Sequence, residues 1–177
     1  LPALQLGSPA FADGARLPIR FTADGAGVSP PLIWGRIPEG AASLALIVED
    51  PDVPAMRPLV HGLVWNLPPE PGGLNEGAIR KDGAGGAEGE DVGRHSLFAE
   101  GWLPPDPPSG HGEHRYVFQL FALAETPDPG PSPRRSALLK AMADRVLAAA
   151  VLTGTYSRGD EADIGPVAAL SAVVPSR

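Results

Sequence analysis

The sequence predicts a mostly β, β-rich α+β domain in which strands come first and one helix follows near the C-terminus. Short apolar runs alternate with turn residues, and the 22 glycines and 22 prolines among 177 residues separate these runs instead of forming one low-complexity tract. Helical spacing of apolar residues occurs only late in the chain. A chain of 177 residues buries roughly 70 % of its unfolded surface in one core, so we expect a single domain over residues 1–177.

The first half of the chain contains two strong strand predictions. Residues 43–50, SLALIVED, form a continuous apolar run that ends in charge, which is typical of a central strand buried on both faces. Residues 60–68, VHGLVWNLP, form the second. If this segment is extended, His61, Leu63 and Trp65 point to one side.

A third strand is predicted at residues 114–123, HRYVFQLFAL, which are rich in aromatic and β-branched residues. Alternation along this strand places His114 and Tyr116 on a shared face. Residues 16–24, RLPIRFTAD, predict a weaker strand, and Pro18 within them indicates an edge strand or a bulge.

The predicted helix covers residues 133–152. Ser132 is a suitable cap, Pro133 suits the first helical position and Gly154 follows the end. Its apolar residues recur at helical spacing and make one stripe, which we expect to pack on a sheet: Leu138, Leu139, Met142, Val146, Leu147 and Ala150.

Composition excludes several classes of protein. The net charge of −7 argues against nucleic-acid binding, because a phosphate backbone is held by clustered Lys and Arg. No apolar run reaches the length of about 18 residues that a membrane-spanning helix needs. We expect cytoplasmic residence, although a chain that begins at Leu1 without methionine is also compatible with a leader that has been removed.

Two further segments have distinctive composition. Residues 82–93, DGAGGAEGEDVG, are rich in glycine and acidic residues and predict a mobile surface loop. Near the C-terminus, PVAALSAVV is short and apolar. This tail can dock on the domain or on a neighbouring subunit, and it is one reason to expect a homodimer.

Ionisable and polar residues stand at the boundaries of the three strong strands. Asp50 and Asp52 follow the first strand, His61 begins the second, and His114 with Tyr116 begins the third. If these strands are neighbours in a sheet, the five side chains converge at one edge. Taken singly, each is more often structural than functional: an aspartate next to proline commonly forms a turn, and a histidine in a strand commonly satisfies its own hydrogen bonds. Their coincidence at three boundaries favours a site.

The motifs resemble the phosphatidylethanolamine-binding protein family, and more closely its bacterial branch, the Raf kinase inhibitor-like proteins. The resemblance rests on EDPDVP, on HGLVWNLP a few residues later, and on PPSGHGEHRYVFQLFAL, together with the upstream segment SPPLIWGRIPEGAASLALIVEDPD. It runs from about Ser29 to Ala124, over half of the chain.

This resemblance implies two antiparallel sheets with peripheral helices and a small pocket at the sheet's edge for phosphate-like anions or phospholipid headgroups. It implies a non-enzymatic protein without a cofactor, which can modulate a partner protein such as a kinase or hydrolase. Matched to this sequence, the pocket residues would be Asp50, Asp52, His61, Pro107, Pro108, His114 and Tyr116. Asp106 departs from the family's small residue, and a third carboxylate at the mouth would weaken phosphate binding or favour a zwitterionic or cationic ligand.

The chemistry expected of the pocket depends on its carboxylates. A carboxylate beside an imidazole favours the protonated ring and orients it, so Asp50 would charge and position the histidines while His61 and His114 donate to the ligand. Tyr116 would add a hydroxyl donor. Arg115 points away from these side chains by alternation, and we expect it to pair with a carboxylate, for example one of the Asp-Pro-Asp motif.

Two enzymatic alternatives remain open on the sequence. The aspartates and histidines are suitable ligands for zinc or manganese in a metal-dependent hydrolase, although no closely spaced ligand motif such as H-E-x-x-H occurs. Ser109 with nearby His111 invites a covalent hydrolase, but it lacks the G-x-S-x-G context.

Overall fold

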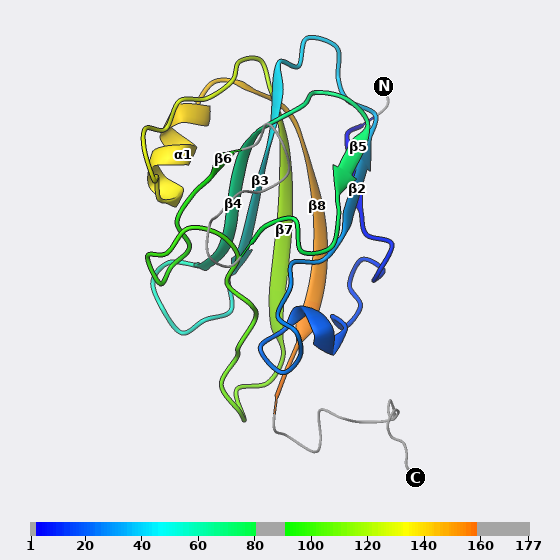
Figure 1. Cartoon of the computed structure of the whole chain (residues 1–177), viewed down its shortest axis with the longest axis vertical. Coiled ribbons are helices and arrows are strands. Elements are labelled where there is room, and N and C mark those ends of the chain that lie inside the picture. Colours follow the sequence, from blue (N-terminus) through cyan, green and yellow to red (C-terminus); the bar gives the residue numbers. More distant parts are fainter. Residues whose placement is uncertain (1–2, 81–90, 159–177) are drawn as a thin grey trace.

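The computed structural model describes residues 3–80 and 91–158 and shows a mostly β fold with two antiparallel sheets. The small sheet has the order β1 (Gln5–Gly7), β2 (Leu32–Gly35), β5 (Gly72–Leu74). The large sheet has the order β6 (Asp91–Val92), β4 (Leu59–Leu67), β3 (Ser43–Asp50), β7 (His114–Leu123), β8 (Val146–Tyr156). The helices are the 3-10 turn η1 (Ile19–Phe21) and α1 (Arg135–Met142), and Figure 1 shows them on the periphery. Neither is long and apolar enough to cross a membrane, and no other helix occurs in the described ranges.

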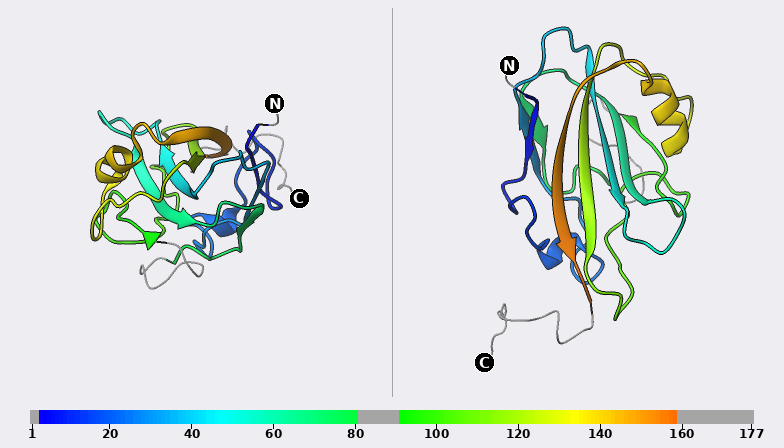
Figure 2. Two further views of the ribbon diagram at one scale, coloured as in Figure 1. Left: turned by 90° about the horizontal axis from the view of Figure 1, so that it is seen from above. Right: turned by 180° about the vertical axis from the view of Figure 1, so that it is seen from behind.

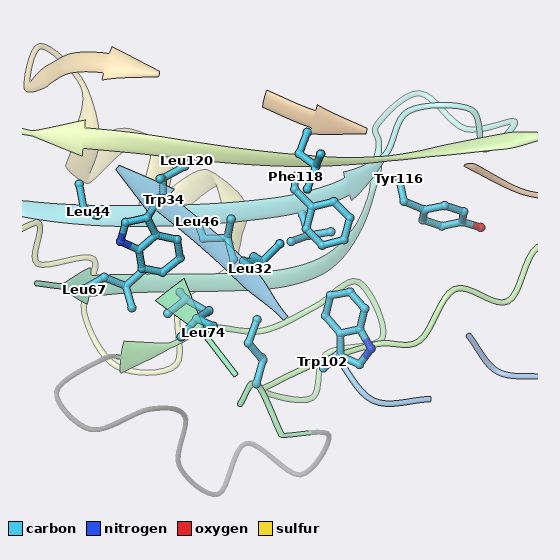
Figure 3. Packing of buried hydrophobic residues seen from close by; sticks show 14 of the residues in the cluster. Leu32, Trp34, Leu44, Leu46, Leu67, Leu74, Trp102, Tyr116, Phe118 and Leu120 are labelled. Atoms are coloured by element: carbon cyan, nitrogen blue, oxygen red, sulfur yellow. The ribbon is translucent and has the colours of Figure 1, made fainter. Parts of the chain in front are cut away.

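The large sheet is covered on both faces, which explains why every residue of β3 is buried, as a central strand requires. One face packs against the small sheet, and Figure 3 shows Trp34 and Leu46 within this cluster. The other face packs against α1 through Leu138 and Met142, so the predicted helix–sheet contact is confirmed. The two views of Figure 2 show the helix and the small sheet on opposite sides.

The predicted helix over residues 133–152 is right only in its first half. The α-helix ends at Met142, Asp144 takes a positive φ of 64°, and the chain then enters β8. Alanine-rich sequence with apolar residues at helical spacing is ambiguous, and here pairing along the whole length of β7 outweighs helix propensity. Gly154 therefore lies inside a strand, where a Cβ atom would meet Leu17 Cδ2 at 2.5 Å.

Two smaller predictions also fail. Residues 16–24 do not form a strand: they contain the turn η1, with Pro18 at its N-cap, and Arg16 makes an isolated bridge to Thr155. Ser132 does not cap α1, because its hydroxyl donates to Glu100 at 2.6 Å. The acidic segment 82–93 lies largely outside the described residues, apart from its last residues, which form β6, and so does the apolar tail.

A β-bulge interrupts the ladder between β3 and β4. Val48 pairs with Gly62 and Glu49 pairs with Val60, which leaves His61 as one extra residue in β4. A bulge of this kind changes the direction in which the extra side chain points, and bulges are over-represented next to functional sites.

The strand ends at which the sequence places polar residues lie together at one end of the large sheet. Asp50 at the end of β3 pairs with Leu59 at the start of β4, and His114 at the start of β7 pairs with Tyr156 at the end of β8. In Figure 1 these are the lower ends of the four strands. The three predicted strands are therefore neighbours, with β3 between β4 and β7.

Candidate functional site

A cavity of about 310 Å³ opens at this edge of the sheet. Six of the seven predicted site residues line it: Asp50, His61, Pro107, Pro108, His114 and Tyr116. The seventh, Asp52, does not. The lining also includes Asp106, which was expected at the mouth, and seven residues that the resemblance did not supply: Val53, Pro54, Leu59, Leu97, Leu103, Pro104 and His111.

Asp50 and His114 form a buried pair on the cavity wall. The Asp50 side chain is 2 % exposed and that of His114 is 3 % exposed, and Asp50 Oδ2 lies 2.6 Å from His114 Nδ1. The other carboxylate oxygen accepts a hydrogen bond from the backbone N–H of Asp52 at 2.8 Å. Both oxygens of Asp50 are thus used within the protein, which fixes the orientation of the His114 ring and leaves its Nε2 for other contacts.

Asp52 has a different role from Asp50, although only one residue separates them. Its carboxylate accepts two hydrogen bonds from the guanidinium of Arg115, at 2.8 and 3.0 Å, and a third from the Arg115 backbone N–H at 2.8 Å. The expected pairing of Arg115 with the Asp-Pro-Asp motif is therefore confirmed. The side-chain hydrogen bond from Arg115 lowers the pKa of Asp52. Asp52 closes the turn after β3 and does not face the cavity.

His61 reaches the cavity because of the bulge in β4. Simple alternation predicts that it shares a side with Leu63 and Trp65, and this is wrong: those two residues pack against α1, whereas the His61 ring lies 5.2 Å from the Tyr116 ring and 6.4 Å from the Trp102 ring, between centroids. The bulge places His61 on the face that the cavity occupies.

The protonation state of His61 also differs from the expectation. Its Nδ1 lies 2.7 Å from the carbonyl oxygen of Leu103, and a carbonyl only accepts, so Nδ1 carries the hydrogen. The residue is 1 % exposed, and burial lowers its pKa from 6.5 to about 4. The ring is neutral at physiological pH, with a lone pair on Nε2, and of the two histidines it is His114 that hydrogen-bonds to Asp50. The expectation that both histidines donate to a ligand is wrong for His61.

Tyr116 contributes a hydroxyl that stays protonated. Burial raises its pKa above the ordinary value of 10.0, and the charge of Asp50 adds to the effect. Figure 3 shows the Tyr116 ring beyond Phe118 at the end of the apolar cluster, with its hydroxyl oxygen pointing away from that cluster. Tyr116 thus belongs both to the apolar core cluster and to the lining of the cavity.

The proline-rich segment that forms the mouth is held by Arg158. The Arg158 guanidinium donates to Asp106, to the carbonyl of Pro107 at 3.2 Å, and to Asp24 at 2.9 Å. Asp24 also accepts from Tyr156 at 2.7 Å. Because Arg158 is shared between Asp24 and Asp106, it offsets only part of the charge of Asp106, which weakens but does not remove the predicted reason for weak anion binding. Sequence reasoning missed Arg158, since no motif marks an isolated arginine after a strand.

The residues proposed for the enzymatic alternatives do not assemble into a recognisable centre. Ser109 lies in an exposed turn outside the cavity lining, although His111 lines the cavity, with its ring centroid 6.2 Å from that of His114. Among residues 3–80 and 91–158, no group of three or more histidines and carboxylates is arranged to hold a metal ion.

Comparison with known proteins gives a consistent result. The phosphatidylethanolamine-binding protein model matches residues 7–157. A UPF0098 protein from Methanothermobacter thermautotrophicus is 40 % identical over 88 % of this chain and all of its own length. Two crystal structures are similar to this one. The first, a candidate phosphatidylethanolamine-binding protein homologue, CT736 of Chlamydia trachomatis, has a TM-score of 0.78 and 37 % identity over 89 % of this chain and 99 % of its own. Escherichia coli YbcL has a TM-score of 0.81 and 28 % identity over 89 % of this chain and 100 % of its own.

The two-sheet fold with a cavity at the strand ends defines a ligand-binding β-sandwich. The chain belongs to the phosphatidylethanolamine-binding protein family. Membership supports a ligand-binding fold that is in general non-catalytic. That one domain extends over the whole of residues 1–177 stays a prediction.

Proposed function

We propose that the protein binds, without catalysis, a small ligand that carries a phosphate-like anionic group, in the cavity beside β3, β4 and β7. The observation that carries this proposal is the buried contact of 2.6 Å between Asp50 and His114 on the cavity wall. Both oxygens of this carboxylate already accept hydrogen bonds from protein donors, and one of them holds the His114 ring. Its position suits the task of holding an imidazole ready to donate.

The hydrogen-bond donors that a ligand would meet are His114 and Tyr116. His114 donates through Nε2 when the ring is protonated, and the Tyr116 hydroxyl, whose pKa is raised by burial, keeps its proton at neutral pH and can donate. The walls are largely apolar or proline, which lowers the local dielectric and strengthens such contacts. The cavity volume of about 310 Å³ suits a headgroup-sized molecule.

Isothermal titration calorimetry with phosphoethanolamine and with ethanolamine tests the proposal, because the two ligands differ only in the phosphate. We expect binding of the first and not the second. Replacing His114→Phe should weaken phosphoethanolamine binding roughly tenfold or more, as expected for loss of one hydrogen bond to a charged group. The matched control is Asp52→Ala, outside the cavity, which should leave the affinity unchanged. Equal binding of both ligands would contradict the proposal.

The biological context stays part of the proposal. The ligand could be a free anion or a phospholipid headgroup, and binding could modulate a protein partner such as a kinase or hydrolase. We also expect a homodimer in the cytoplasm. The exposed apolar residues Val146, Leu147 and Val151 on the edge strand β8 offer a surface for such pairing. Light scattering that detects only monomer at micromolar concentration would remove the dimer from this account.

A further inference from the structure

The unpartnered ring nitrogen of His61 distinguishes this cavity from a simple anion site. His61 Nε2 is buried and has no hydrogen-bond partner within the part of the chain that is described. A buried polar atom without a partner is uncommon and unfavourable. Because His61 lines the cavity, a ligand bound there is the candidate partner for this nitrogen. Because Nδ1 donates to the carbonyl of Leu103, the unpartnered nitrogen is an acceptor.

From this geometry we infer that the ligand's phosphate is a singly protonated monoester whose P–OH donates to His61 Nε2. The inference rests on the proposed function. A phosphate monoester at its first ionisation step offers both a hydroxyl donor and anionic oxygens. The oxygens face His114 and Tyr116, and the hydroxyl faces His61. A phosphate diester, such as the phosphate of an intact phospholipid, has no P–OH and would place an oxygen lone pair against the lone pair of Nε2.

The surroundings of His61 keep it an acceptor over the working pH range. The ionisable groups whose charges act on the ring are Asp50 from β3, His114 from β7 and His95 from the loop after β6, while Leu103 supplies its carbonyl. Tyr116 lies against the ring, and Asp106 and His111 line the same cavity. Burial outweighs these charges and keeps the pKa of His61 at about 4, so the ring stays neutral between pH 5 and 8.

The decisive comparison is methyl phosphate against methyl sulfate, two anions of nearly equal shape. Methyl sulfate carries one negative charge and no proton, whereas methyl phosphate is singly protonated below its second pKa of about 6. At pH 5.5, calorimetry should show methyl phosphate binding roughly tenfold to a hundredfold tighter, the effect of leaving one buried acceptor unpaired. Above pH 6 its affinity should fall towards tenfold per pH unit, with uptake of about one proton.

Titration of the cavity's other groups affects both anions, so the ratio of their affinities isolates the proton on the phosphate. Phosphoethanolamine should behave like methyl phosphate, and glycerophosphoethanolamine, a diester, like methyl sulfate. This pair separates a free monoester from an intact lipid headgroup. The variant His61→Phe, which keeps a ring but removes the acceptor, should abolish the preference. His95→Asn, which replaces a buried histidine outside the cavity lining, should retain it.

The outcomes separate the two proposals. If neither anion binds, the proposed function itself is wrong. Equal affinity for the two anions, or an affinity for methyl phosphate that rises from pH 5.5 to 7.5, would overturn the inference and leave anion binding intact. A preference for methyl phosphate that survives in a folded His61→Phe protein would also overturn it. If this variant does not fold, the comparison of the two anions across pH in the unmodified protein still decides.

Discussion

Replacing Asp50→Ala should destabilise the protein far more than the same change at Asp52, although the two carboxylates belong to one turn. Asp50 accepts from His114 Nδ1 at 2.6 Å and from the Asp52 backbone N–H at 2.8 Å, and its side chain is 2 % exposed. Alanine would leave a buried donor and a partly buried donor unpaired. The unpaired buried donor costs about 1–3 kcal/mol and the partly buried donor about 1 kcal/mol, so we expect a loss of about 2–4 kcal/mol in the free energy of unfolding.

Asp52→Ala is the matched control. The Arg115 side chain is 59 % exposed and that of Asp52 is 26 % exposed, and a solvent-exposed ion pair contributes about 1 kcal/mol or less. For a protein of this size 1 kcal/mol moves the melting temperature by about 2–4 °C, so the expected shifts are about 4–16 °C for Asp50→Ala and at most about 4 °C for the control. Urea denaturation followed by tryptophan fluorescence measures both. Losses that agree within 0.5 kcal/mol, a margin of about the usual error, would refute the distinction between the two carboxylates.

Three further predictions follow from other contacts. Gly154→Ala should cost about 1–3 kcal/mol by thermal unfolding, because its Cβ would crowd Leu17, whereas Gly35→Ala, with no atom within 4 Å of the new Cβ, should be nearly neutral. The pKa of His61 is lower in the folded than in the unfolded protein, so the unfolded state takes up the proton of this histidine first as the pH falls. The free energy of unfolding should therefore decline by about 3 kcal/mol from pH 6.5 to about 4, and His61→Phe should flatten this decline. Arg158→Met should loosen the cavity mouth, lowering stability by about 1 kcal/mol and weakening anion binding at low salt. Adding Asp106→Asn to this variant removes the carboxylate that has lost its cation and should restore the affinity.

The central strands could be predicted because strands buried on both faces consist of continuous apolar and β-branched residues, a pattern that the sequence shows directly. β3 and β7 begin and end at the predicted residues, and their order in the sheet brings Asp50 and His114 together as the strand boundaries suggested. The edge strand β8 could not be predicted, because an edge position needs fewer apolar and β-branched residues. Its alanines carry a helical pattern that only pairing with β7 overrides.

Features that depend on pairing between distant segments also could not be predicted from the sequence. The direction of His61 depends on a bulge that appears only when β4 is set in register with β3. The pairing of Arg158 with Asp106 joins residues 52 positions apart and carries no motif. Both features change the chemistry expected of the cavity: the first turns a presumed donor into an acceptor, and the second offsets part of the charge of a carboxylate at the mouth.

These two corrections together limit the charge of the ligand. Asp52 is paired with Arg115, and Asp106 shares Arg158 with Asp24, so none of these pairs leaves an excess of positive charge for the cavity in a protein whose net charge is −7. Asp50 remains, and His114 beside it balances that charge when its ring is protonated. His61 adds no positive charge. A doubly charged phosphate would therefore enter a cavity without a matching excess of positive charge, whereas a singly protonated phosphate brings one negative charge less and supplies the donor that His61 Nε2 lacks.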